Sequence, residues 1–250
     1  MMSERGAAAL RVEGLCVRYA KTRVVHDVSF DVRPGEIFGL IGLNGAGKTT
    51  IIKTLIGLRA PECGSTFLSG GDPSDPVARR ALAYLPERFD PPWFLTGIEF
   101  LKFSLRLYGR TYEESAILEG ARSLALDPAS LRRRVQTLSK GMRQKLGLLA
   151  TVLTGAPVLI LDEPMSGLDP LARARVKSLL TTCRAANRTV FLSSHILSDL
   201  TELCDRVAVL HEGRIVFCGA PGALIVRESV SNLEQAFLSV IGVEYLVRSA

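Results

Sequence analysis

The chain has 250 residues, of which 47% are hydrophobic, and a formal net charge of +6 at pH 7. This length allows one domain with a substantial core, with or without a smaller insert, and this composition excludes a disordered chain. The mild basic excess suits a protein that handles phosphates or lies near anionic lipid. Because the basic residues are scattered, we expect no nucleic-acid partner, and we interpret the one tight cluster, residues 132–134, as a solvated face.

The first predicted elements are antiparallel strands within residues 10–34, where apolar and polar residues alternate as in a sheet with one wet face. A short apolar run at residues 37–41 follows, then a glycine-rich turn, then helical spacing over residues 48–58. A strand, a glycine turn and a helix form one half of a parallel α/β unit.

Residues 91–153 predict a helical insert, because apolar residues recur there at helical spacing. Buried strands return at residues 158–161, 190–192 and 207–210 with a helix between each pair, which predicts a parallel sheet wound with helices. We also expect an edge hairpin around Glu212 and Gly213 and a short amphipathic helix around Phe237. The chain is therefore predicted to be α/β, with an N-terminal antiparallel β-subdomain, a parallel core sheet and a helical insert.

The cysteines and the chain start indicate the compartment. The N-terminal residues 1–9 have no apolar core, so we expect no signal peptide. No stretch approaches the roughly 18 apolar residues of a spanning helix, so a role at a membrane would need another chain to cross it. The cysteines are expected to be reduced, as in a cytosolic protein, since no two stand at C-x-x-C spacing. They are Cys16, Cys63, Cys183, Cys204 and Cys218.

Residues 42–49 read GLNGAGKT and fit the phosphate-loop pattern G-x-x-x-x-G-K-[ST]. Glycines let the backbone approach a ligand closely, so that successive N–H groups form an anion nest at the start of the next helix. Lys48 adds a mobile positive charge for the outer phosphates, and the Thr49 hydroxyl suits Mg²⁺. A structural glycine turn is the alternative, and the flanking strand and helix argue against it. The predicted nucleotide contacts are Gly42, Leu43, Asn44, Gly45, Ala46, Gly47, Lys48, Thr49 and Thr50.

An apolar strand ends in two carboxylates, Asp162 and Glu163. A strand buried on both faces tolerates charge only at its ends, and open α/β sheets bind ligands at the carboxyl ends of their strands. We expect Asp162 to hold Mg²⁺ through water, and Glu163 to orient or deprotonate an attacking water. The alternative is a strand that merely ends in a polar turn at Pro164, and the phosphate loop argues against it.

Residues 138–144 read LSKGMRQ, which resembles the signature segment of ATP-binding-cassette (ABC) ATPases. The resemblance runs from about Leu10 to Gly219, and the motifs follow in the family's order. It implies the ABC ATPase fold over residues 10–219, with a short helical extension over residues 220–250. In that family the signature contacts the nucleotide of a partner subunit, so the resemblance implies a dimer in which Ser139 and Gly141 contact the second copy's ATP. Viewed alone, Ser139 would be interpreted as a plain helix N-cap.

The resemblance implies further site residues. Tyr19 lies where the family places an aromatic ring against adenine, and Asp169 lies in the loop that crosses to the partner subunit. His195 matches the switch histidine that contacts the terminal phosphate. The predicted catalytic residues are Lys48, Glu87, Glu163 and His195. Outside this series, Tyr19 and His195 would be interpreted as structural.

Glu87 stands where the family usually has a glutamine that reaches the metal and the attacking water. A glutamate can still bind Mg²⁺, and its charge should tighten the dependence on metal. The signature also has Lys140 and Met142 where glycine and glutamine are commonest. By analogy with export-type cassettes, these departures favour export over import, as does the terminal helix around Phe237.

The predicted function is ATP hydrolysis that powers export through separate transmembrane permease subunits, with ATP and Mg²⁺ as cofactors. The chain would lie on the cytoplasmic face of the membrane. Residues 91–95, PPWFL, are either an anchor for the membrane subunit or core packing of the insert.

Three alternatives compete with this prediction. A non-transport ABC ATPase of translation, repair or cofactor assembly is disfavoured, because the chain has neither a second cassette nor a long coiled coil. An unrelated phosphate-loop kinase or switch would lack the signature segment and the acidic strand end. A module that binds ATP without cleaving it would not need Lys48, Asp162, Glu163 and His195 together.

Overall fold

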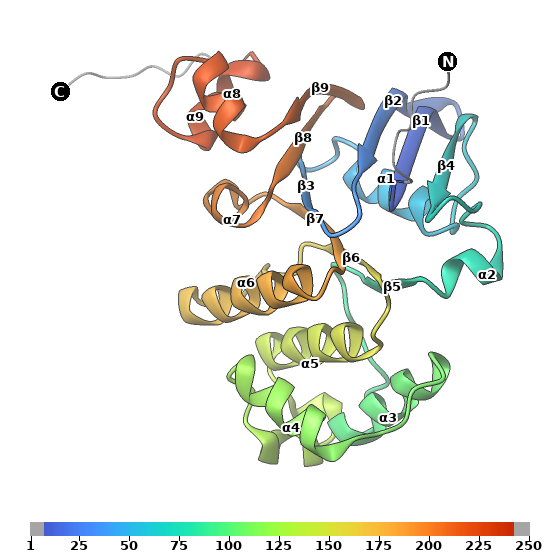
Figure 1. Ribbon diagram of the computed structural model, residues 1–250, viewed down its shortest axis with the longest axis vertical. Coiled ribbons are helices and arrows are strands. Elements are labelled where there is room, and N and C mark those ends of the chain that lie inside the picture. Colours follow the sequence, from blue (N-terminus) through green and yellow to red (C-terminus); the bar gives the residue numbers. More distant parts are fainter. Residues whose placement is uncertain (1–7, 243–250) are drawn as a thin grey trace.

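The computed structural model describes residues 8–242, which form two β-sheets covered by helices (Figure 1). The smaller sheet is antiparallel, with strand order β2-β1-β4. It confirms the predicted N-terminal strands and adds β4, which the sequence pattern did not reveal. Its strands are β1 (Leu10–Tyr19), β2 (Thr22–Val32) and β4 (Cys63–Leu68).

The larger sheet has six strands in the order β5-β6-β7-β3-β8-β9, and its first five strands are parallel. The edge strand β9 is antiparallel to β8 through a tight turn, in which Glu212 and Gly213 have φ of 45° and 72°, as a two-residue hairpin requires. The strands are β3 (Ile37–Ile41), β5 (Leu82–Leu85), β6 (Val158–Asp162), β7 (Thr189–Ser194), β8 (Arg206–His211) and β9 (Arg214–Gly219).

Two apolar cores cover the two faces of the large sheet, because successive residues of each strand point to opposite faces. On one face, α1 (Lys48–Leu55) and the small sheet bury residues such as Phe38 and Ile160. The rings of Phe30, Phe38 and Phe191 stack there with centroids 5.4–6.0 Å apart, so the two sheets share one core.

Helices cover the other face, and those of the predicted insert lie away from the small sheet in Figure 1. Thr96 and Glu99 form a capping box that starts the insert's first helix. The insert consists of α3 (Gly97–Leu107), α4 (Glu114–Ser123), the short 3₁₀ turns Pro128–Arg132 and Val135–Thr137, and α5 (Lys140–Leu153). The remaining helices are α2 (Pro76–Arg79), α6 (Pro170–Ala185), α7 (Leu197–Leu203), α8 (Pro221–Arg227) and α9 (Leu233–Val240).

Some predicted boundaries need correction. The helix expected over residues 48–58 ends at Leu55, because Gly57 has a left-handed φ of 72° that breaks the helix. The amphipathic helix around Phe237 is confirmed as α9, and α8 lies before it within the predicted helical extension over residues 220–250. Residues 243–250 of the predicted extension, and residues 1–7, lie outside the described part of the chain.

The expectation that all cysteines are reduced is wrong for one pair. Cys16 on β1 and Cys63 on β4 face each other in the small sheet, with Cα atoms 5.0 Å apart, and form a disulfide. The prediction failed because pairing of β1 with β4 was not foreseen. Cys183 and Cys204 are buried and free, and Cys218 is exposed and free.

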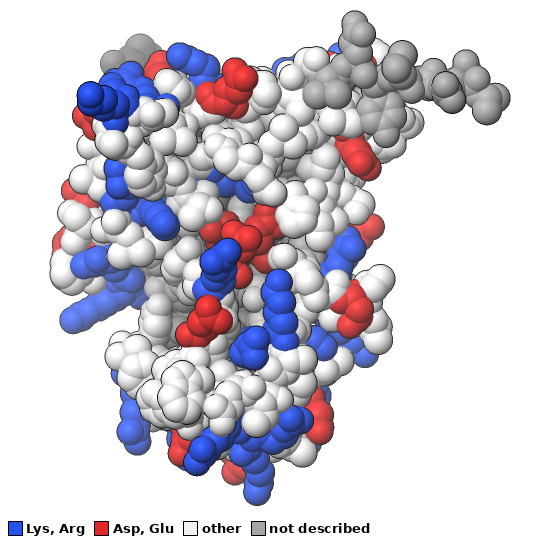
Figure 2. All heavy atoms as spheres, turned by 180° about the vertical axis from the view of Figure 1, so that it is seen from behind, with Lys and Arg blue, Asp and Glu red and all other residues white. Residues whose placement is uncertain are grey.

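The surface agrees with the scattered charges of the sequence. In Figure 2, basic side chains are spread from top to bottom of the visible face, with acidic side chains among them. Residues 132–134 are exposed, as expected for a solvated face. Over residues 8–242, none of the helices has both the length and the apolar character needed to span a bilayer.

Candidate functional site

The glycine-rich loop lies between β3 and α1, at the centre of the parallel sheet, and borders a pocket of about 460 Å³. This pocket brings together most of the residues that the sequence analysis selected, from loops that follow β3, β5, β6 and β7. Its lining residues are Val24, Leu43, Asn44, Gly45, Gly47, Lys48, Thr49, Thr50, Glu87, Asp162, Glu163 and His195.

Lys48 is held under the loop at the first position of α1 and is only 7% exposed. Its Nζ donates to the Gly42 carbonyl oxygen at 2.8 Å and lies 4.0 Å from Glu163 Oε1. Gly42 must be glycine, since a Cβ there would lie 2.6 Å from the carbonyl oxygen of Leu210. The loop thus presents a buried cation and free helix N–H groups, which together form an anion site.

Asp162 ends β6 and is 1% exposed. The Thr49 hydroxyl donates to Asp162 Oδ2 at 3.1 Å, and the Ser193 hydroxyl donates to Oδ1. Burial raises the pKa of this carboxyl, the two hydroxyl bonds lower it, and the nearby negative charge of Glu87 raises it. Burial, helped by Asp162 and Glu87, also raises the pKa of Tyr84 to about 12.

The oxygens at this point fit Mg²⁺. A carboxylate and a hydroxyl from different elements meet beside the phosphate loop, and Glu87 lines the same pocket. Among the described residues there is no cluster of three or more histidine, cysteine, aspartate or glutamate side chains that could hold a metal. Magnesium needs only one or two protein oxygens, because it retains several waters.

Glu163 has an unusual backbone that turns its side chain into the pocket. Its φ is 52°, which costs on the order of 1–3 kcal/mol for a residue other than glycine. The Glu163 N–H donates to both the carbonyl oxygen and the hydroxyl of Ser193, at 3.2 and 3.0 Å, which holds this conformation. The carboxylate, 6% exposed, lies between Lys48 and His195, whose Nδ1 is 2.8 Å from Glu163 Oε2.

Ser193 is a site residue that the sequence analysis missed. It is completely buried at the end of β7 and bonds both to the Asp162 carboxylate and to the Glu163 N–H. Its position two residues before His195, at the carboxyl end of a central strand, is the signal that could have identified it.

Several predicted residues do not line this pocket. Tyr19 is 39% exposed, and the Arg59 guanidinium lies 3.7 Å from its ring centroid. Ser139 caps α5, accepting from the Met142 N–H at 3.2 Å, and Asp169 caps α6, accepting from the Ala172 N–H at 2.8 Å. Ala46 and Gly42 belong to the loop, and Gly141 to the first turn of α5, but none of the three lines the pocket either.

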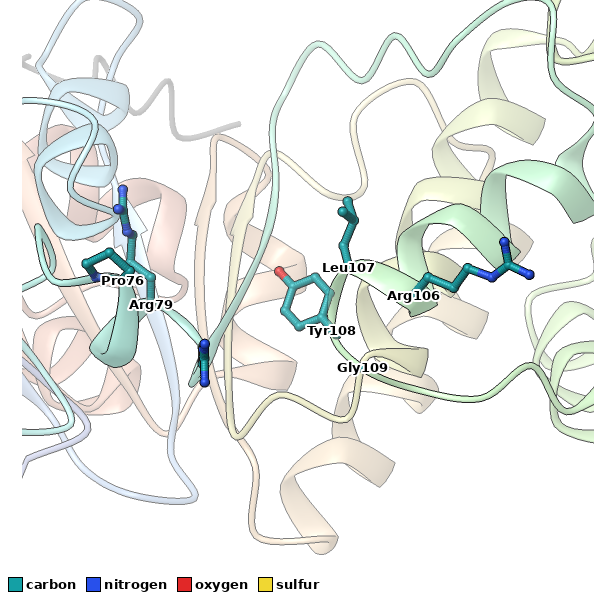
Figure 3. Close-up of a pocket in the computed structure, with 7 residues that line it drawn as sticks. Pro76, Arg79, Arg106, Leu107, Tyr108 and Gly109 are labelled. Carbon is teal, nitrogen blue, oxygen red and sulfur yellow. The ribbon is translucent and has the colours of Figure 1, made fainter.

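A second hollow, of about 580 Å³, lies between α2 and the end of α3 (Figure 3). Pro76 and Arg79 stand on one side and Tyr108 and Leu107 on the other, while the Arg106 side chain points away. Arg80 and Gly109 complete the lining, and none of the predicted site residues is among them.

In the segment at residues 91–95, Pro91 is buried and Leu95 packs against the core, but the two aromatic side chains are exposed, so core packing is wrong for them. Trp93 and Phe94 are 63% and 57% exposed, and their rings meet edge to face with centroids 5.7 Å apart. On α3, Phe103 and Leu107 are also exposed, at 51% and 70%.

Comparisons with known proteins agree with this geometry. The ABC transporter family model matches residues 25–166. An uncharacterized ABC transporter ATP-binding protein of Nostoc is 35% identical over 209 residues, which are 82% of this chain and 62% of that protein. The chain therefore spans less than two thirds of that relative. A Nod factor export ATP-binding protein of Paraburkholderia xenovorans is 36% identical over 247 residues, covering 92% of this chain and 77% of that protein.

A solved structure described as the ATP-binding subunit of an ABC transporter superposes with a TM-score of 0.84 at 32% identity, and the match covers 93% of this chain and 99% of the other. The fold class predicted from the sequence is thereby confirmed. Taken with the matching family model and the export-protein relative, this likeness shows that the chain belongs to the ABC transporter ATP-binding family.

Proposed function

We propose that this chain binds and hydrolyses ATP to power export across a membrane through separate transmembrane subunits. The observation that carries the proposal is the placement of Glu163. Its carboxylate lies between Lys48 and His195, beside the Asp162–Thr49 pair and over the phosphate loop. A pure binding module would have no need of a strained carboxylate facing the phosphate site.

The loop N–H groups and Lys48 bind the phosphates, and Tyr19 stacks on adenine with the ring face that Arg59 leaves free. Glu163 orients the attacking water and accepts its proton. His195 Nδ1 fixes the Glu163 carboxylate, and the half-exposed histidine ring is close enough to the pocket to meet the terminal phosphate. Mg²⁺ bound through Thr49, Asp162 and Glu87 would neutralise phosphate charge.

A second cassette completes the site in this proposal. Ser139, Gly141 and Asp169 lie outside the pocket of their own chain, although Ser139 and Gly141 begin a helix whose N-terminus suits an anion. We therefore assign these residues to the nucleotide of a partner copy, with residues 10–219 as the cassette and residues 220–250 as its extension. Closure of the dimer would exclude water from both sites.

The permease is proposed to dock along α3. Trp93 and Phe94 at its start and Leu107 at its end are exposed apolar side chains of the kind that anchor interfaces. Leu107 also borders the second hollow, where neither Arg79 nor Arg80 has an ion-pair partner among the described residues. A permease helix with an apolar face and an acidic end fits this surface, which would hold the chain at the cytoplasmic face of the membrane.

The substitution Glu163→Gln tests the proposal. The neutral amide keeps the size of the side chain but cannot accept a proton, so turnover should fall by about 10²–10⁴-fold while ATP affinity stays nearly the same. The matched control is Glu119→Gln, an exposed acid on α4, which should behave as the unaltered chain. Near-normal hydrolysis by the Glu163→Gln protein would remove Glu163 from the chemistry.

A further inference from the structure

Asp199 is a buried charge that the proposed chemistry does not use. It lies in the first turn of α7, is 3% exposed, and does not line the nucleotide pocket. Two cations from α6 surround it: Arg173 donates from Nε and Nη2 to Oδ2 at 2.8 and 2.7 Å, and Lys177 Nζ lies 3.2 Å from Oδ1. Both carboxylate oxygens are therefore occupied by side chains of one neighbouring helix.

This ion cluster connects the helices that follow two loops of the site, and in each case the charged residue is four positions after a predicted site residue. Arg173 is four residues after Asp169, which caps α6, and Asp199 is four residues after His195, which precedes α7. Arg173 lies about one helical turn after Asp169, and Asp199 is the third residue of α7, so both charged residues lie close to the start of their helices. The first turn of α7 has no side-chain cap of its own, and the helix is only 7 residues long. The orientation of α7 therefore depends on its contacts with neighbouring elements, including the ion pairs with α6.

A purely stabilising role does not account for this cluster. Removing charges from water costs several kcal/mol per ion, and apolar residues of similar size often hold two helices as well or better. Apolar side chains from both helices already meet in the same core, including Val176, Leu180 and Leu200. The charged cluster additionally restricts the orientation of α7 relative to α6, because the planar guanidinium group meets the carboxylate in only a few geometries.

We propose that Asp199 is a positioning residue, which with Arg173 fixes His195 relative to the start of α6. Asp169, the N-cap of α6, is assigned to the partner copy, so the cluster links the partner-facing start of α6 to the contact between His195 and Glu163. The inference rests on the proposed function, since it requires His195 and Asp169 in their assigned roles.

The test is Asp199→Asn in the full-length chain. The amide keeps the shape of the side chain, but it removes the negative charge. It also replaces one of the two acceptor oxygens that face the cations with an N–H donor. Turnover should fall roughly threefold to thirtyfold, the range for broken coupling contacts, with the KM for ATP within about twofold of its normal value. Arg173→Gln should match this loss, and the double variant should lose no more than either single one. Glu202→Gln, which removes only the exposed end of the same cluster, is the matched control.

A second readout separates positioning from general stability. On the residual single-turnover rate of His195→Ala, Asp199→Asn should have no further effect, because the group through which it acts is absent. An equal loss in both backgrounds, or unchanged turnover in Asp199→Asn, overturns the inference. If the Asp199→Asn protein does not fold, the same comparison is made with Arg173→Gln, alone and combined with His195→Ala. Should His195→Ala or Glu163→Gln retain normal turnover, the proposed function itself is wrong.

Discussion

Replacing Ser193 with alanine removes one hydroxyl that serves both acidic residues of the pocket. The hydroxyl donates to Asp162 Oδ1 and accepts from the Glu163 N–H, and both side chains are almost completely buried, Ser193 at 0% and Asp162 at 1% exposure. A hydrogen bond to a charged group contributes about 1.5–3 kcal/mol, and the Glu163 N–H keeps its bond to the Ser193 carbonyl oxygen. We therefore expect the free energy of unfolding to fall by about 1.5–3 kcal/mol.

That loss corresponds to a drop in the thermal midpoint of roughly 3–12 °C for a chain of this size, measurable by calorimetry or circular dichroism. The matched control is Ser194→Ala. Ser194 is 1% exposed, but its hydroxyl accepts only from the neutral Ile196 N–H, so its loss should cost about 0.5–1.5 kcal/mol.

Activity gives a second, independent measure. Burial already raises the pKa of Asp162, and the Ser193 bond opposes this rise. A carboxyl with a raised pKa takes up its proton at a higher pH as the solution is acidified, so activity that needs the carboxylate is lost earlier. Ser193→Ala should move the acid limb of the ATPase pH profile to higher pH, while Ser194→Ala leaves it in place. Equal midpoints and equal acid limbs for the two variants would refute this reasoning.

Three further predictions concern the loop, the metal site and the docking surface. Gly42→Ala places a Cβ 2.6 Å from the Leu210 carbonyl oxygen, so it should lower stability by about 1–3 kcal/mol in chemical denaturation and weaken ATP binding in calorimetric titration. Glu87→Gln removes a charge that raises the pKa of Asp162, so the acid limb should move to lower pH and half-maximal activity should need more Mg²⁺. Trp93→Ala removes a side chain that is 63% exposed, so the thermal midpoint should hold while the fraction sedimenting with native membranes falls; equal sedimentation would argue against the docking surface.

The sequence predicted those parts of the fold that local patterns specify. The glycine loop, the strand that ends at Asp162 and the cap at Ser139 each have a local signature, and the structure has all three. The structure brings Lys48 and Glu163 within 4.0 Å although they lie far apart in the chain, because both follow parallel strands of one sheet, whose carboxyl ends lie at the same edge.

The parts that could not be predicted depend on contacts distant in sequence. The disulfide between Cys16 and Cys63 follows from pairing of β1 with β4, and no local spacing reveals which strands pair. Ser193 resembles any small polar residue until Asp162 is placed 31 residues away in sequence and one strand over. The positive φ of Glu163 is likewise imposed by two bonds from the neighbouring strand, because glutamate has no preference for that conformation.

The stacked rings of Phe30, Phe38 and Phe191 restrict how this molecule can change shape. They join strands β2, β3 and β7, which belong to different sheets, with interplanar angles of 11–13°. Close-packed interiors resist sliding, so β2, β3 and β7 move as one rigid unit. The small sheet, which carries Tyr19 on β1, and the loop that follows β3 are therefore held against each other by one packed core, so larger shape changes are expected in the helices on the opposite face.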